Sequence, residues 1–116
     1  MINVEIRNFV GERCVTSQDG QRVYEKIYPK LVAGEKIRLD FEGVTVFASP
    51  FFNFAIGQLL KDLKPDDLNR LLSVEHLVPD GMLVWHRVVK NAKEYYTNLN
   101  ARRAVDEILK HQAEDE

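Results

Sequence analysis

IRLDFEGVTVFASPFFNFAIGQLL, residues 37–60 of the chain, changes its hydrophobic period midway. Apolar and polar residues alternate over residues 36–41, which predicts a strand with one buried face. From Pro50 to about Leu63 the apolar residues follow helical spacing on more than half of the girth, which predicts a largely buried helix. This segment therefore predicts a strand, a turn and a helix in succession.

The residues before this segment predict a first strand and a first helix. Residues 2–10 begin with strict alternation of apolar and polar side chains, as in a half-buried strand. Thr16 or Ser17 then offers an N-cap for a helix whose apolar residues recur every four positions and face a sheet. Pro29 lacks a backbone donor, so we expect this helix to kink or stop near it.

The residues after it predict two helices and a short strand. Within the segment itself, residues 44–47 form a second short extended piece. After it, Pro65 followed by two aspartates starts a short helix that ends near Leu72. A short strand is expected over residues 74–77, and spacings of three and four from Asp80 onward predict a long last helix. This order predicts an α/β fold with a small mixed β-sheet backed by helices and a long C-terminal helix.

Composition fits one globular domain. The chain has 116 residues, of which 45% are hydrophobic and 29% charged, so we expect a single domain over residues 1–116. Within it, residues 1–99 should form the core and residues 100–116 a C-terminal helical extension. The apolar face of that extension exceeds what the core needs and suggests a protein partner or a homodimer; its residues are Ala104, Val105, Ile108 and Leu109.

Charge, cysteine content and apolar run length exclude several classes. The longest apolar runs are too short for a membrane helix or a secretory signal, so we expect no membrane association. A net charge of −2 and a pI near 5.9 lack the basic footprint of a duplex-binding protein, which makes nucleic acid an unlikely partner. The lone Cys14 cannot form an internal disulfide, so a cytoplasmic location is the expectation.

The start of the central helix carries the candidate recognition residues. Ser49 directly precedes a proline and therefore suits an N-cap, a role worth about 1 kcal/mol. The same hydroxyl is also a candidate phospho-acceptor, whose added charge a helix N-terminus would favour. Pro50, Phe51 and Asn53 form the candidate partner-binding surface beside it.

Three further residues have predicted structural roles. Asp40 stands at a strand end, where an aspartate commonly accepts backbone hydrogen bonds in a turn. Gly43 should supply a backbone conformation that other residues disfavour, and Gly57 should allow the helix to approach a neighbouring element closely.

The sequence predicts neither a metal site nor catalysis. His76, His86 and His111 are scattered and lack ligand spacing with each other or with Cys14, so a metal site would need a tertiary coincidence. No nucleophile elbow and no glycine-rich phosphate loop is present. We therefore expect a protein that is not an enzyme and that uses no cofactor.

The central segment resembles the STAS-like domain of unknown function labelled DUF4325. The resemblance rests on DFEGV at residues 40–44 and on FNFAIG at residues 52–57. That family is similar in fold to anti-sigma-factor antagonists, which the resemblance implies are switch proteins that bind histidine-kinase-like ATPases and are phosphorylated on a serine at a helix start. In a gapless comparison Ser49 falls on that serine, although its neighbours Ala48, Pro50 and Phe51 replace an acidic residue and small residues.

These observations together favour a non-catalytic STAS-like protein-interaction and regulatory module. The implied partner is a histidine-kinase-like ATPase, and phosphorylation of Ser49 would control its binding. Two alternatives stay open: a small-molecule or nucleotide-binding sensor that uses the helix N-terminus as an anion site, and a structural subunit that dimerises through the last helix.

Overall fold

A small parallel sheet forms the base of the molecule. The structure, a computed structural model, describes the backbone of residues 1–114 and the side chains of residues 1–98. Strands β1 (Ile2–Glu5), β3 (Ile37–Asp40) and β5 (Leu72–Glu75) lie side by side in the order β1-β3-β5, with β3 at the centre. Both pairings are parallel. All three strands therefore end at the same edge of the sheet.

A second, two-stranded sheet lies next to the first. Strand β2 (Arg13–Cys14) pairs with β4 (Val46–Phe47), again in parallel. The predicted α/β class is confirmed, whereas the prediction of one mixed sheet is corrected to two small sheets with parallel pairings. The first strand is also shorter than predicted, because the chain turns into the one-turn helix α1 (Ile6–Phe9) where alternation ends.

Helix α2 (Ser17–Val32) begins as the sequence predicts. The side chain of Thr16 is the N-cap and accepts a hydrogen bond of 3.1 Å from the Asp19 backbone N–H. Pro29 lies inside the last turn of this helix, which continues to Val32. The predicted buried face is confirmed, because its apolar residues are almost fully buried: Val23, Ile27 and Leu31.

The predicted helix over residues 50–63 is two elements. Helix α3 (Ser49–Ala55) ends at Ile56, and the 3₁₀ helix η1 (Gly57–Lys61) follows at once. The backbone of Ile56 has φ −121° and ψ −46°, which leaves the α-helical path. Helix α3 packs against both α2 and α5 (Pro79–Glu114), whereas η1 packs against α5 and α4 (Pro65–Leu71), so the neighbours of the chain change at this break.

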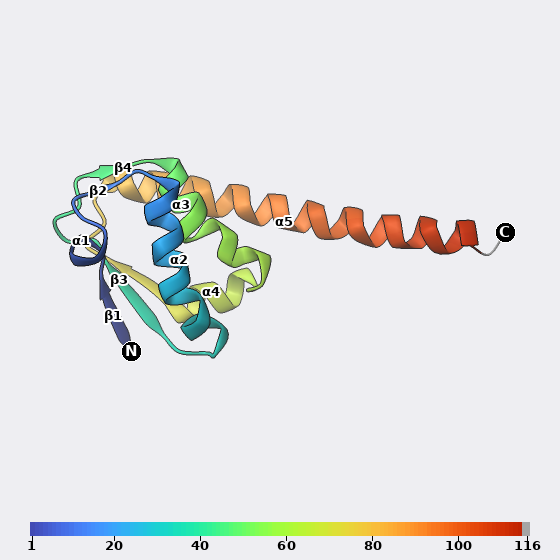
Figure 1. The fold of residues 1–116 in the computed structure, drawn as a ribbon, viewed down its shortest axis with the longest axis horizontal. Helices are drawn as coiled ribbons and strands as arrows, with labels where there is room; N and C mark the ends of the chain where they lie inside the picture. Colours follow the sequence, from blue (N-terminus) through green and yellow to red (C-terminus); the bar gives the residue numbers. More distant parts are fainter. Residues whose placement is uncertain (115–116) are drawn as a thin grey trace.

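The last third of the chain has the predicted order. Helix α4 (Pro65–Leu71) leads into β5, and helix α5 (Pro79–Glu114) follows. Strand β5 covers Leu72–Glu75, so His76 follows the strand, where the sequence predicted it inside one. The long C-terminal helix is confirmed and extends away from the rest of the molecule (Figure 1). The predicted apolar face of residues 100–116 lies outside the described side chains.

Aromatic rings connect α3 to α5 through the core. The fully buried ring of Phe52 lies 5.8 Å from the ring of Phe47, stacked on it, and 5.8 Å edge-on from Trp85 of α5. Phe41 lies 6.0 Å from the same ring. Trp85 is half-buried and packs on the core. These contacts dock the first part of α5 onto the domain.

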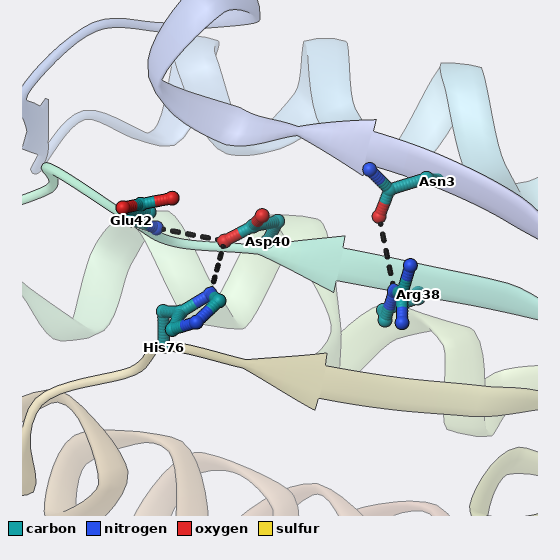
Figure 2. A network of polar contacts seen from close by, with 5 residues as sticks. All are labelled: Asn3, Arg38, Asp40, Glu42 and His76. Carbon is teal, nitrogen blue, oxygen red and sulfur yellow. Dashed lines mark hydrogen bonds and ion pairs between the residues drawn. The ribbon is translucent and has the colours of Figure 1, made fainter.

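The two faces of the main sheet differ. Side chains of one face, such as Val4 and Leu39, are buried in the core. The other face carries polar side chains that are exposed or half-buried: Asn3, Glu5, Arg38, Asp40, Ser73 and Glu75. Figure 2 shows part of this polar face, with helices drawn behind the strands. Among the described residues, none of the helices combines the length and apolar character that a bilayer crossing requires.

Candidate functional site

Ser49 is the first residue of α3 and does not cap it. The N-cap position falls on Ala48, and no side chain makes a capping hydrogen bond to this helix. Ala48 is extended, with φ −141° and ψ 150°, and its N–H donates to the Cys14 carbonyl at 3.0 Å. That contact continues the β2–β4 pairing by one residue and delays the cap by one position. The prediction of Ser49 as an N-cap is therefore wrong, and its half-buried hydroxyl has no capping role.

The three predicted partner-binding residues lie on different faces of α3. Pro50 and Asn53 are exposed, whereas Phe51 is only 1% exposed and packs edge-on against Phe52 at 5.3 Å. Phe51 therefore belongs to the core, and its place in the predicted surface is corrected. Phe54, which was not among the predicted surface residues, is 44% exposed. Helical periodicity provides the signal, because residues 50, 53 and 54 share one face.

A groove lies where α3, η1 and α5 meet. It has a volume of about 210 Å³ and its walls are largely apolar. Tyr95 is 61% exposed at this groove, and its ring lies 5.0 Å edge-on from Tyr96. The lining residues are Asn53, Gly57, Gln58, Asn91, Ala92, Tyr95 and Tyr96.

Gly57 marks the close contact of η1 with α5 at this groove. A methyl group at Gly57 would lie 3.5 Å from Val88 Cγ1 and 3.7 Å from Ala92 Cβ. The neighbouring element that the sequence left unidentified is therefore α5. These distances are ordinary van der Waals contacts, so the two elements touch without requiring a glycine.

A second group of polar residues lies at the carboxyl edge of the main sheet. Asp40 ends β3, and its Oδ1 accepts a hydrogen bond of 3.0 Å from the Glu42 backbone N–H. This confirms the predicted turn role. The same oxygen lies 2.9 Å from Nδ1 of His76, which directly follows β5 and has a left-handed backbone with φ 58° (Figure 2). The turn after β3 also contains Gly43 at φ 83°, as predicted.

The two partners shift each other's pKa in opposite directions. The Glu42 backbone N–H and then His76 hold the pKa of Asp40 below its usual value. The hydrogen bond that His76 donates to Asp40 raises the pKa of His76, and the charges of Asp40, Glu42 and Glu75 add to this effect. Three carboxylates therefore favour a positive charge at the position of the imidazole.

The fold produces the coincidence that sequence spacing did not predict. Oxygen or nitrogen ligand atoms of Asp40, Glu42 and His76 all lie within 4.8 Å of one another. Asp40 and His76 are 36 positions apart, so no motif links them. The available signal was that both residues lie at the ends of neighbouring strands, because parallel strands end at one edge.

A polar cavity adjoins this group. It has a volume of about 210 Å³ and shares two of its walls, Asp40 and Glu42, with the cluster. Glu5 accepts a hydrogen bond from the Asn8 amide, and Arg7 pairs with Glu12 at 3.1 Å. The lining residues are Glu5, Arg7, Asn8, Asp40 and Glu42.

The comparisons with known proteins identify a family. The model of the STAS-like domain of unknown function (DUF4325) matches residues 19–82. The matched segment runs from the first turn of α2 to the first turn of α5, and it includes Ser49, Asp40 and His76. No curated protein and no solved structure matches the chain significantly.

Proposed function

Because the chain belongs to the family of STAS-like domains of unknown function (DUF4325), we propose that it is a non-catalytic regulatory module that binds a protein partner. The binding region is the α3–α5 surface, which we define as Pro50, Asn53, Phe54 and Tyr95. The observation that carries this proposal is the apolar groove lined by Asn53 and the exposed ring of Tyr95, with the exposed ring of Phe54 on the residue after Asn53. Aromatic side chains of this kind dominate binding energy at protein interfaces.

The two aromatic residues have an exposure that the fold does not require. Phe54 is 44% exposed and Tyr95 61% exposed, although other aromatic residues of the same elements are buried or half-buried. Gln58 connects the two parts of the surface, because it lines the groove and donates a hydrogen bond from its side-chain amide to the Phe54 carbonyl. A partner that covers Tyr95 and Asn53 would exclude water from the groove that they line.

Ser49 provides the control element of this proposal. It lies one turn before Asn53 on α3, so a phosphate on Ser49 would add about −1.5 to −2 charges beside the surface. Such a charge weakens an apolar contact or repels an acidic partner. The similarity to anti-sigma-factor antagonists makes a histidine-kinase-like ATPase the partner and kinase of this proposal.

The proposal includes a cytoplasmic location, where such ATPases present their kinase domains. The single cysteine supports this location, because Cys14 is buried and forms no disulfide within the chain.

Affinity co-purification from the native host, followed by binding measurements with the purified partner, tests this function. We expect Tyr95→Ala and Phe54→Ala each to weaken binding by about thirtyfold, as hot-spot residues do. Leu83→Ala is the matched control, because Leu83 is 65% exposed on α5 and does not line the groove. Its affinity should equal that of the wild type.

Ser49→Asp and Ser49→Ala separate the phosphorylation from the surface itself. The charged variant should lose the partner, whereas the alanine variant should retain it, and mass spectrometry should find phosphate on wild-type Ser49. A partner that binds all of these variants equally would contradict the proposed surface. Recovery of no protein, together with thermal stabilisation by a nucleotide, would replace this function by that of a nucleotide sensor.

A further inference from the structure

The carboxyl edge of the main sheet brings together one imidazole and two carboxylates. Asp40 and Glu42 come from the end of β3, and His76 comes from the end of β5. Their ligand atoms lie within 4.8 Å of one another (Figure 2). This ligand set mixes nitrogen with oxygen, which suits a divalent transition-metal ion better than Mg²⁺ or Ca²⁺.

The geometry points to a metal site at this edge, and we propose that Asp40, Glu42 and His76 bind Zn²⁺ or a similar divalent ion. Zinc bonds to nitrogen and carboxylate oxygen of about 2.0–2.2 Å in a tetrahedron place neighbouring ligand atoms about 3.4 Å apart. Asp40 Oδ1 and His76 Nδ1 are 2.9 Å apart, close to that spacing. Glu42 is exposed, so its carboxylate is free to turn toward the same point.

The turn after β3 leaves Asp40 able to act as a ligand. Its Oδ1 accepts the Glu42 N–H, a bond that orients the carboxylate in the same way as the outer hydrogen bonds of many metal sites. His76 is held beside it by a left-handed backbone, with φ 58°. The ends of β3 and β5 therefore place two of the three ligands side by side.

The charges around the site favour a cation. Carboxylates of Asp40, Glu42 and Glu75 act on His76, and Glu5 lies across the adjoining cavity. The nearby guanidinium groups have other partners: Arg7 pairs with Glu12, and Arg38 Nε donates to the side-chain oxygen Oδ1 of Asn3 at 3.2 Å. Arg38 lies close enough for its charge to act on Asp40, but neither guanidinium forms an ion pair with Asp40 or Glu42 among the described contacts.

The adjoining cavity provides room for the remaining coordination position. Three protein ligands leave one corner of a tetrahedron for water or a small ligand. The cavity of about 210 Å³ shares Asp40 and Glu42 with the proposed site, so a water molecule bound to the ion has space on that side. Its other lining residues, Glu5, Arg7 and Asn8, are polar and can form hydrogen bonds with such a water.

Titration of the metal-free, ¹⁵N-labelled full chain with ZnCl₂ at pH 7 tests the site. We expect saturable one-to-one binding, with the largest NMR shifts at residues 40–42 and 75–77. CaCl₂ and MgCl₂ should bind at least about tenfold more weakly, because these ions do not favour imidazole. Calcium binding as tight as zinc binding, or shifts located elsewhere in the chain, would overturn the proposal.

Conservative variants decide which residues are ligands. Asp40→Asn keeps an oxygen that can accept the Glu42 N–H, and His76→Asn tolerates the left-handed backbone, so both should fold. Each should weaken zinc binding by about tenfold or more. His86→Gln is the control, because His86 is an exposed histidine of α5 outside the cluster, and it should bind as the wild type does. Unchanged affinity in both cluster variants, or an equal loss in the control, would refute the site.

Discussion

At the scale of single residues, Cys14 is the clearest case of an environment that changes chemistry. Its side chain is fully buried in the core. The sequence indicated only that Cys14 has no partner for an internal disulfide. Burial, and then the negative charge of Asp19, raise the pKa of the thiol to about 12. A thiol in this state reacts slowly, because the thiolate is the nucleophile.

We therefore predict that Cys14 does not react with a thiol reagent at pH 8 in the native protein and reacts at once in denaturant. Because the folded pKa of about 12 exceeds the reference value of 9.0, the thiol stabilises the fold fully below pH 9. This contribution is lost as the pH rises toward 12. Denaturant unfolding of wild type and Cys14→Ala at pH 8 and pH 10.5 measures it, since other titrating groups act equally on both proteins. Rapid labelling of the native thiol would contradict this assignment.

A second residue-scale lesson concerns Asp40 and Ser49. The turn role of Asp40 was predictable, because it depends on a hydrogen bond to a residue two positions away. The N-cap of α3 was not predictable, because its position depends on the residue at which the β2–β4 pairing ends. The Ala48 N–H bonds to the Cys14 carbonyl, 34 residues earlier in the chain, and no local pattern encodes that contact.

At the scale of elements, two glycines test how the helices pack. At Gly20 in α2, a methyl group would lie 2.3 Å from the Phe51 carbonyl oxygen. The backbone of α3 therefore occupies the space that a side chain at position 20 would need. At Gly57 in η1, the nearest atoms of α5 lie 3.5 Å and 3.7 Å away. The same chemical change is thus expected to have different costs at the two sites.

We predict that Gly20→Ala lowers the free energy of unfolding by about 1–3 kcal/mol, because the carbonyl of α3 must move away. Gly57→Ala should change it by less than about 0.5 kcal/mol. Both replacements alter the unfolded chain alike, so each is the other's control in urea unfolding. Equal changes in the free energy of unfolding at the two positions would mean that the backbone of α3 does not lie against Gly20 of α2.

The division of the central helix is also an element-scale result. The apolar pattern of residues 50–63 is continuous, so it predicts one helix, and the break at Ile56 has no marker except Gly57. The break coincides with a change of packing, since α3 packs on α2 and α5, whereas η1 packs on α5 and α4. Packing also explains why Phe51 was predicted at the surface and is buried. Helix α3 is covered on several sides, so more of its residues are buried than periodicity alone indicates.

At the scale of the whole molecule, the long axis comes from α5. The molecule measures 62 × 27 × 22 Å, and Figure 1 shows α5 leaving the domain toward the C-terminus. The described side chains of α5 that pack on the core lie in its first half: Val84, Trp85, Val88, Val89, Ala92 and Tyr96. The domain and the distal part of the helix are thus separable in physical terms.

A chain that ends at Asn98 should therefore fold, with a free energy of unfolding within about 1 kcal/mol of the full chain. A chain that ends at Met82 should lose cooperative unfolding, because it lacks Trp85 and Val88, which cover the core. Circular dichroism during thermal unfolding compares the two truncated chains.

Light scattering of the full chain and the chain ending at Asn98 also tests a homodimer through the last helix, since only the full chain would then be a dimer. Loss of folding in the longer truncation would show that residues 99–116 support the core.

The sequence by itself determined the elements whose cause is local. Alternation set strand β3, Thr16 set the start of α2, spacing set the length of α5, and the DFEGV and FNFAIG motifs identified the family. Each depends on residues a few positions apart, so pattern and capping chemistry suffice.

Only the tertiary structure decided which side chains meet. Parallel pairing of β3 with β5 places His76 at Asp40, and packing of η1 on α5 places Asn53 in one groove with Tyr95. These contacts join residues more than 30 positions apart, and their cost in chain entropy is offset by burial of the shared core, which belongs to no single segment. The family and most of the helices and strands could therefore be predicted from the sequence, whereas both candidate sites are formed only by the tertiary structure.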